Sequence, residues 1–155
     1  MLLPLDFVTM QWYGRGPGES YWDRKDGNPV GVYTDAIHNL YHPYVRPQES
    51  GNHTDVRWAK LMRKDGSGVM IGANETVLNV KALPYSRAQL DAGDVREAVQ
   101  THSALLEFDK NIHLDVDFLQ AGVGGIDSWG SPALTQYRLP FKDYKYSYWI
   151  IPFKK

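Results

Sequence analysis

The sequence predicts an all-β protein, folded as an antiparallel β-sandwich with long loops. Gly, Pro, Asn or Asp interrupt the chain roughly every ten residues, which is typical of short antiparallel strands. Ten tyrosines and five tryptophans supply amphipathic aromatic side chains, which fill β cores or line polar ligand surfaces. The length of 155 residues indicates one unit, so we expect a single sandwich domain or fragment over residues 1–155.

The first strand is expected at residues 7–14, "FVTMQWYG". Side chains alternate partly in this stretch, so that Val8, Met10 and Trp12 fall on one face. Phe7 then falls on the opposite face.

A hairpin is expected at residues 55–74. Its first strand runs from Val56 to Leu61, Asp65-Gly66 forms the turn, and the second strand returns at residues 69–71. Further strands are expected at residues 78–85, 112–124, 134–141 and 144–153.

At most one short helix is expected, at residues 85–99. Ser86 and Gln89 have the spacing of a capping box, and Gly93 limits the length of the helix. Residues 33–44 have a weak helical period, and for them a loop is equally compatible with the sequence.

Composition excludes several classes of function. Seventeen basic and eighteen acidic residues leave a formal net charge of -1, so we expect no nucleic acid and no membrane as partner. The absence of cysteine excludes disulfides and thiolate metal sites. The first residues, "MLLPLDFVTMQW", lack the features of a signal peptide, and the compartment stays undetermined.

Paired carboxylates are a weak signal for glycoside hydrolysis, because eighteen acids make pairs common. Glu49 and Asp55 are one candidate pair. Asp115 and Asp117 share one face of an expected strand. Solvated or hydrogen-bonded surface acids are the simpler interpretation.

Metal, nucleophile and phosphate chemistry have weaker signals still. His38 and His42 have i,i+4 spacing, but the HExxH pattern is missing. Ser128 lies in no GxSxG elbow. The stretch "GRGPGE" at residues 14–19 lacks the lysine of a P-loop, and Pro17 removes a backbone amide. Loop or surface residues are the simpler interpretation of these histidines, and we expect no metal in this chain.

The stretch "GVGGIDSWGSP" at residues 122–132 places a tryptophan in a glycine-rich loop. Sugars stack their C–H faces on aromatic rings, and carboxylates bind their hydroxyls. Trp129, flanked by Asp127 and Ser128, suits that chemistry. A tryptophan folded back onto the core fits the pattern equally well.

Three ordered motifs carry a resemblance to a known family. The stretch "WYGRGPGESYWDR" at residues 12–24 is similar to the Trp-x-Gly-x-Gly-Pro-x-Glu-x-Tyr-x-Asp-Arg signature of family 2 β-galactosidases. The stretch "YVRPQESGNHTDVRW" at residues 44–58 resembles a second signature of their last domain. "GVGGIDSWGSP" resembles the third, with its Gly-x-Gly-Gly-x-Asp-Ser-Trp.

The resemblance implies a C-terminal sandwich domain of the galactose-mutarotase-like type, here incomplete. In such enzymes this domain packs against a TIM barrel and completes the galactoside pocket with one loop tryptophan. That tryptophan corresponds to Trp129. Asp127 and Ser128 match the motif and are assigned mainly a loop-shaping role, with an Asx-type bond from Asp127 to the backbone ahead.

Three further residues, in the second signature, are weaker candidates for the border of the sugar pocket: Glu49, Asn52 and His53. Asp23 and Arg24 of the first signature are expected to pair or to cap strands.

The chain is too short to contain the whole enzyme. A TIM barrel needs at least about 200 residues, so both catalytic glutamates, and the magnesium and sodium of the family, are expected in other domains. The resemblance therefore implies no catalytic residue and no cofactor in this chain. The expected partners are a β-galactoside or related glycan, the catalytic barrel, the remaining sandwich strands and a second copy of the chain. Two alternatives stay open, a stand-alone carbohydrate-binding module and, less favoured, an aldose mutarotase-like protein.

Overall fold

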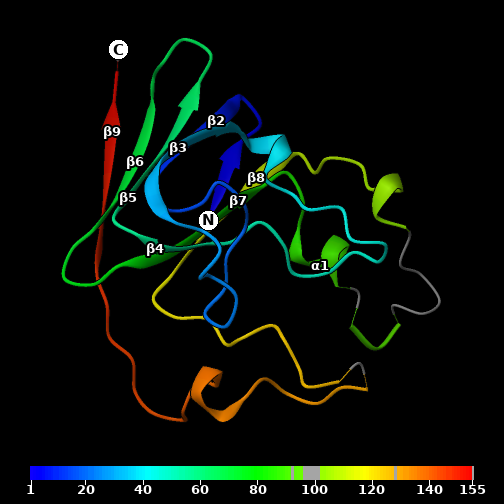
Figure 1. The fold of residues 1–155 in the computed structure, drawn as a ribbon. Helices are drawn as coiled ribbons and strands as arrows, with labels where there is room; N and C mark the ends of the chain where they lie inside the picture. Colours follow the sequence, from blue (N-terminus) through cyan, green and yellow to red (C-terminus); the bar gives the residue numbers. More distant parts are fainter. Residues whose placement is uncertain (92, 96–101, 128, 155) are drawn as a thin grey trace.

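The protein is a sandwich of two antiparallel β-sheets (Figure 1). The computed structural model describes residues 1–91, 93–95, 102–127 and 129–154. Within these residues the fold confirms the predicted all-β class, with long connections and one α-helix of a single turn. None of the helices in the described part has the length and apolar character needed to cross a bilayer.

The smaller sheet has four strands in the order β1-β8-β7-β4. Their bounds are β1 Leu2–Pro4, β8 Asn111–Asp117, β7 Leu78–Leu83 and β4 His53–Val56. The larger sheet has five strands in the order β3-β2-β5-β6-β9. Their bounds are β3 Val30–Ala36, β2 Phe7–Arg15, β5 Trp58–Arg63, β6 Gly68–Ala73 and β9 Tyr148–Phe153.

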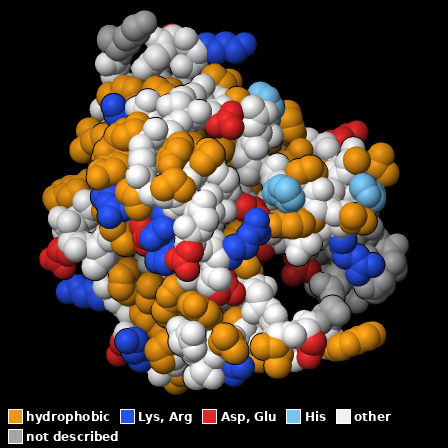
Figure 2. All heavy atoms as spheres, in the orientation of Figure 1, with side chains coloured by type: hydrophobic (Ala, Val, Ile, Leu, Met, Phe, Trp, Pro, Cys, Tyr) orange, Lys and Arg blue, Asp and Glu red, His pale blue; other side chains and the backbone are white. Residues whose placement is uncertain are grey.

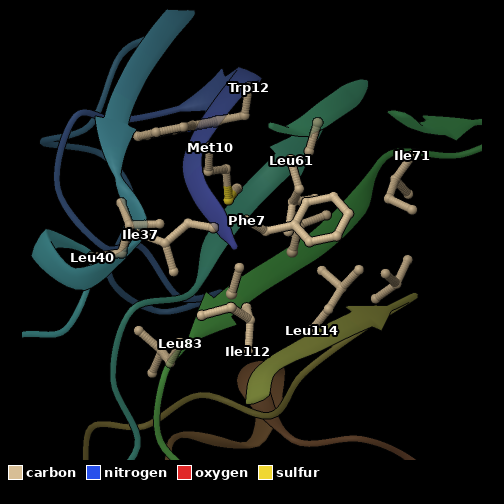
Figure 3. Close-up of a cluster of buried hydrophobic side chains, with 14 of the residues drawn as sticks. Phe7, Met10, Trp12, Ile37, Leu40, Leu61, Ile71, Leu83, Ile112 and Leu114 are labelled. Carbon is tan, nitrogen blue, oxygen red and sulfur yellow. The ribbon is translucent and has the colours of Figure 1, made fainter. Parts of the chain in front are cut away.

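The hydrophobic core lies between the two sheets (Figure 3). Met10 and Leu61 project into it from the larger sheet, and Ile112 and Leu114 from the smaller one. In β8 the buried side chains alternate with polar ones, because successive side chains of a strand point to opposite faces. The outer face of the smaller sheet is therefore polar, and several candidate site residues lie on it.

A bulge in β2 changes the facing of Phe7. The pairing of β2 with β5 shifts register between Phe7 and Thr9. One extra residue in a strand reverses the face of every side chain beyond it. Phe7 is consequently buried together with Met10 and Trp12, so its predicted placement on the opposite face is wrong.

The predicted strand from Val56 to Leu61 is divided between the two sheets. Val56 ends β4 in the smaller sheet, and Trp58 begins β5 in the larger one. Asp55, with a φ of 54°, turns the backbone at this crossing. The predicted turn after β5 is confirmed at Gly66, which has a φ of 83°.

Other strand boundaries also differ from prediction. Residues 134–141 form no strand but the single 3₁₀ turn η4, Thr135–Tyr137, and in the described part this segment joins neither sheet. The strand predicted at 112–124 ends at Asp117, and the one predicted at 144–153 begins only at Tyr148. The sequence patterns also missed β1 and β3.

The predicted capping box is confirmed. Ser86 caps α1, Arg87–Leu90: its hydroxyl accepts from the backbone N–H of Gln89, whose side chain accepts in turn from the N–H of Ser86. The helix ends after one turn, and a 3₁₀ turn, η2, follows at Gly93–Val95. The rest of the predicted helix, 96–99, lies outside the described residues. A further 3₁₀ turn, η3, spans Ser103–Leu105.

The ambiguous segment 33–44 is resolved as a strand followed by a turn. Its first four residues complete β3, and the 3₁₀ turn η1, Ile37–Asn39, follows. Ile37 is buried in the core, which accounts for the weak apolar period seen in the sequence.

Candidate functional site

The buried carboxylate of Glu19 joins the first signature to the second. It accepts hydrogen bonds from the Tyr44 hydroxyl, from Ser50 Oγ at 3.2 Å and from Gly51 N at 2.8 Å, and Arg24 Nη1 lies 3.0 Å away. Burial opposes ionisation of this group, but the Tyr44 hydroxyl, the Gly51 N–H and the Arg24 charge together hold its pKa below the ordinary 4.5. Glu19 is therefore an ionised, buried anchor.

A second junction between these signatures is built by Ser20. Its backbone N–H donates to Asn52 O at 2.7 Å, and Asn52 Nδ2 donates back to Ser20 O at 2.8 Å. Thr54 N donates to Ser20 Oγ at 2.9 Å. Asn52 also accepts from Gln120 Nε2 at 3.2 Å. Because Asn52 is 0% exposed, its amide supports the backbone and presents no surface to solvent.

His53 lies in the core side of the same junction. Its ring packs at a tilt of 34° against the indole of Trp12, with centroids 4.1 Å apart, and the residue is 1% exposed. Burial lowers the pKa of His53 to about 4, against smaller opposing contributions from the backbone of Arg15 and the charge of Glu19. His53 is thus neutral at physiological pH and reaches no solvent in this structure.

Glu49 lies on the polar outer face of the smaller sheet. Its carboxylate accepts two hydrogen bonds from Lys81 Nζ, at 3.0 and 2.9 Å, and Asp115 Oδ2 lies 3.1 Å from the same amine. Burial opposes the charged form of Lys81, but these two carboxylates raise its pKa above the ordinary 10.5. The three residues border a cavity of about 240 Å³, which Tyr85 and Arg87 also line.

The candidate acids Glu49 and Asp55 do not form one site in the structure, because they contact different basic residues. Asp55 binds Arg15 Nε and Lys25 Nζ, whereas Glu49 binds Lys81. The two carboxylates therefore bind different basic side chains, and Lys81 is shared with Asp115. On the face that Figure 2 draws, acidic and basic side chains are intermingled rather than gathered by sign.

The candidate metal ligands His38 and His42 lie apart from any cluster of ligands. His38 lies exposed in η1, and His42 packs edge-on against Tyr44 at 4.4 Å between ring centroids. Within the described residues, no three His, Cys, Asp or Glu side chains are grouped to hold a metal ion.

The loop that carries Trp129 is shaped by Asp127. Trp129 N donates to Asp127 Oδ1 at 2.9 Å, and Ser131 Oγ donates to Oδ2 at 2.7 Å. These donors, Ser131 first, lower the pKa of Asp127 below its ordinary value. The expected Asx-type bond to the backbone ahead is therefore present. Ser128, the remaining candidate of this motif, lies outside the described residues.

Trp129 projects from this loop into solvent. The residue is 92% exposed, so the alternative that it folds back onto the core is wrong. Two glycines allow the tight loop: a Cβ on Gly125 would lie 2.3 Å from Ser131 O, and Gly130 has a φ of 98°. The loop therefore presents a bare aromatic face.

Comparison with known proteins gives the family. A family model described as "Beta galactosidase small chain" matches residues 1–150.

The chain belongs to the β-galactosidase small-chain family.

Curated relatives agree with this assignment. The chain is 41% identical over 133 residues to the β-galactosidase of Priestia megaterium, and 41% identical over 141 residues to that of Lactobacillus delbrueckii subsp. bulgaricus. It is 39% identical over 140 residues to β-galactosidase BgaC of Bifidobacterium adolescentis. These matches cover 86–90% of the chain but only 12–13% of each relative. The chain thus corresponds to a small part of a β-galactosidase.

Sequence reasoning missed several residues of the polar face. Lys81 was not singled out, although the alternation of β7 places it beside Asn79 on the outer face. His113 Nε2 lies 2.6 Å from Asp109 Oδ2, an i,i+4 contact that only the bend before β8 creates. The link from Gln120 to Asn52 joins residues 68 apart and left no signal in the sequence.

We expect Glu19→Gln to destabilise the protein by about 2 kcal/mol, because charge-assisted hydrogen bonds are lost. The folded pKa is depressed, so the contribution of Glu19 is present above pH 4.5 and is lost as pH falls through the folded value. Urea unfolding between pH 7 and 3 measures both effects. The variant should show a flatter pH dependence below about pH 4.5 than the parent chain. Glu75→Gln, at an exposed turn, is the matched control; equal losses for both variants would contradict the anchoring role.

We expect His53 to destabilise the fold at mildly acidic pH. Between the ordinary value of 6.5 and the folded value of about 4, the unfolded chain binds a proton that the native chain does not. Stability therefore falls as pH falls through this window. His53→Phe, which keeps a ring against Trp12, should remove the fall, whereas His38→Phe at an exposed site should not. Identical pH profiles for His53→Phe and the parent chain in thermal unfolding would contradict the assignment.

Proposed function

We propose that the chain completes the galactoside-binding pocket of a β-galactosidase and is not catalytic itself. The observation that carries this proposal is Trp129, a nearly fully exposed tryptophan on a loop shaped by Asp127, within a chain of the β-galactosidase small-chain family. A solvent-facing indole on a shaped loop is suited to stack against the C–H face of a sugar ring, because an aromatic face needs only an apolar partner surface.

The other candidates receive different roles in this proposal. Asp127 shapes the loop, since its carboxylate is occupied by Trp129 N and Ser131. Asn52 and His53 are buried, and we assign them to support of the backbone. Glu49 lines the cavity on the smaller sheet and has Lys81 as its partner.

Catalysis belongs to other segments of the enzyme in this proposal. The chain spans only 12–13% of its curated relatives, and the two candidate acids of the second signature, Glu49 and Asp55, bind different basic side chains. We assign the catalytic glutamates, with magnesium and sodium, to a barrel domain, as the resemblance implies. This barrel and the remaining strands of the sandwich are the proposed partners.

The partner surface is expected at β9, on the open edge of the larger sheet (Figure 1). Ile150 lies opposite Ile71 in the register of β6 and β9, so both point to the core side of the sheet. Ile71 is fully buried, yet Ile150 is 47% exposed. The smaller sheet therefore does not cover the core side of β9. On the other face Trp149 and Ile151 are also exposed, and Figure 2 shows apolar side chains along this side of the molecule.

The isolated chain should not hydrolyse a chromogenic galactoside, because the groups that cleave the bond are assigned to other segments. The measurement is a galactosidase assay on the purified chain, with an active full-length relative as positive control. Galactosidase activity that co-purifies with the chain through several steps would refute the proposal that the chain is not catalytic itself. Binding of a galactoside by the isolated chain in a calorimetric titration would instead favour a stand-alone binding module.

Trp129→Ala should weaken galactoside recognition once the chain is placed in a complete enzyme. A suitable host is the Priestia megaterium β-galactosidase, whose matching segment is exchanged for this chain at 41% identity. The loss of stacking is about 1–3 kcal/mol by analogy with base stacking, or roughly 5- to 150-fold in kcat/KM. Trp129→Phe should retain part of the activity. Phe141→Ala, also a fully exposed aromatic residue, is the control, and equal losses in both alanine variants would reject the platform.

The isolated chain should self-associate through β9, because an open apolar edge pairs readily with another chain. Size-exclusion chromatography with light scattering measures the assembly. The double variant Ile150→Thr with Ile151→Thr keeps β propensity and should shift the chain towards monomer. Val32→Thr, on the opposite edge strand β3, is the matched control. A monomeric parent chain that binds no hydrophobic dye would contradict this expectation.

A further inference from the structure

Asp23 belongs to the first signature, but its carboxylate binds the backbone of the third. Val123 N donates to Asp23 Oδ1 at 3.1 Å, and Gly124 N donates to Oδ2 at 2.8 Å. Each carboxylate oxygen thus receives one of two successive backbone N–H groups. Charge-assisted hydrogen bonds are stronger than neutral ones, and a bidentate contact also fixes orientation. This contact joins segments about one hundred residues apart.

Asp23 is itself held in place by the first signature. It lies in the two-residue turn between Tyr21 and Arg24, whose backbones exchange hydrogen bonds at 3.0 and 2.9 Å. Tyr21 OH donates to Glu49 at 3.3 Å, and Arg24 contacts Glu19. Arg24 therefore forms an ion pair, with Glu19, whereas Asp23 binds the backbone of the third signature. The carboxylate of Asp23 projects from a turn tied to the sandwich at both ends.

A second contact holds the base of the same loop. Gly122 N donates to Tyr137 O at 2.7 Å, and the Trp22 ring meets the Tyr137 ring edge-on with centroids 6.2 Å apart. A Cβ on Gly122 would lie 2.6 Å from Asp23 Oδ2 and 2.8 Å from Tyr137 Cβ. The loop base is therefore packed so closely between Asp23 and Tyr137 that only glycine fits at this position.

We propose that Asp23 is a positioning residue that sets where Trp129 meets the sugar. The proposal rests on the proposed function of Trp129. Because the ring of Trp129 is 92% exposed, packing does not hold it, and its position follows from the backbone of the loop. Asp127 shapes the tip of that loop, whereas Asp23 fixes its base to the sandwich. Removing Asp23 should leave the indole present but displaced.

The test uses the complete host enzyme described above, with Asp23→Ala and the isosteric Asp23→Asn. A displaced aromatic platform should lower kcat/KM for a galactoside roughly tenfold for Asp23→Ala, since misplacement by about 1 Å can cost up to a hundredfold. Asp23→Asn keeps one acceptor oxygen and should lose less. Asp26→Ala, at an exposed acid of the same segment, should match the parent enzyme.

The decisive readout is a double-mutant cycle with Trp129→Ala. If Asp23 acts through Trp129, Asp23→Ala should have little further effect on kcat/KM once Trp129 is alanine. A second variant, Gly122→Ala, keeps Asp23 but adds a Cβ that would lie 2.6 Å from its carboxylate oxygen Oδ2. It should lower kcat/KM as Asp23→Ala does, and it replaces Asp23→Ala in the test if that variant fails to fold. Faster amide hydrogen exchange at Val123 and Gly124 in the Asp23 variants would report the released loop independently of activity.

Three results would overturn the proposal, and they distinguish a failure of the positioning role from a failure of the proposed function. Additive losses for Asp23→Ala and Trp129→Ala, or parent-like kinetics for Asp23→Ala, would leave the Trp129 platform standing and make Asp23 a purely structural residue. Parent-like kinetics for Trp129→Ala alone would remove the proposed function, and with it the positioning role of Asp23.

Discussion

The arrangement of the first two signatures depends on one buried carboxylate, that of Glu19. A charge taken out of water is tolerated only where hydrogen bonds and an opposite charge compensate for lost solvation. Glu19 meets this condition through Tyr44, Ser50, Gly51 and Arg24, which all belong to the first two signatures. Two irregular segments are thereby held in one geometry, although neither forms regular secondary structure over most of its length.

Asp23 and the loop of the third signature build on this anchor. Arg24 contacts Glu19, the turn that contains Asp23 closes just before Arg24, and Asp23 holds the backbone of Val123 and Gly124. The three signatures are thus successive parts of one hydrogen-bonded assembly. Many of its contacts join a side chain of one signature to the backbone of another. The spacing of these residues in the sequence therefore does not show the two-residue period of a strand. In our proposal this arrangement gives the exposed Trp129 a defined position although nothing in the described part packs against its ring.

The two sheets leave different kinds of surface, and each kind indicates a different use. The outer face of the smaller sheet is polar, with Lys81 between Glu49 and Asp115, so its charges are satisfied within the chain. β9, in contrast, exposes Ile150 on the side that faces the core and has an open edge. A satisfied ion network is compatible with contact to water. An apolar strand exposed on both faces is instead the partner surface proposed above.

Local sequence determined the elements whose signal is short-range. The all-β class, the turn at Gly66 and the capping box of Ser86 and Gln89 depend on residues within a few positions of one another, and the structure confirms them. The glycine-rich sequence around Trp129 likewise indicated a loop. The Asx-type bond of Asp127 also follows from neighbours in the chain.

Only the tertiary structure decided which segments meet. The bulge beside Phe7, the change of sheet after Asp55 and the exposure of Trp129 depend on partners far away in the chain. The strand predicted at 134–141 failed for the same reason, since in the described part folding does not pair this segment with either sheet. The contact of Asp23 with residues about one hundred positions later has no local signature, because a carboxylate can bind any pair of free backbone N–H groups that folding brings to it.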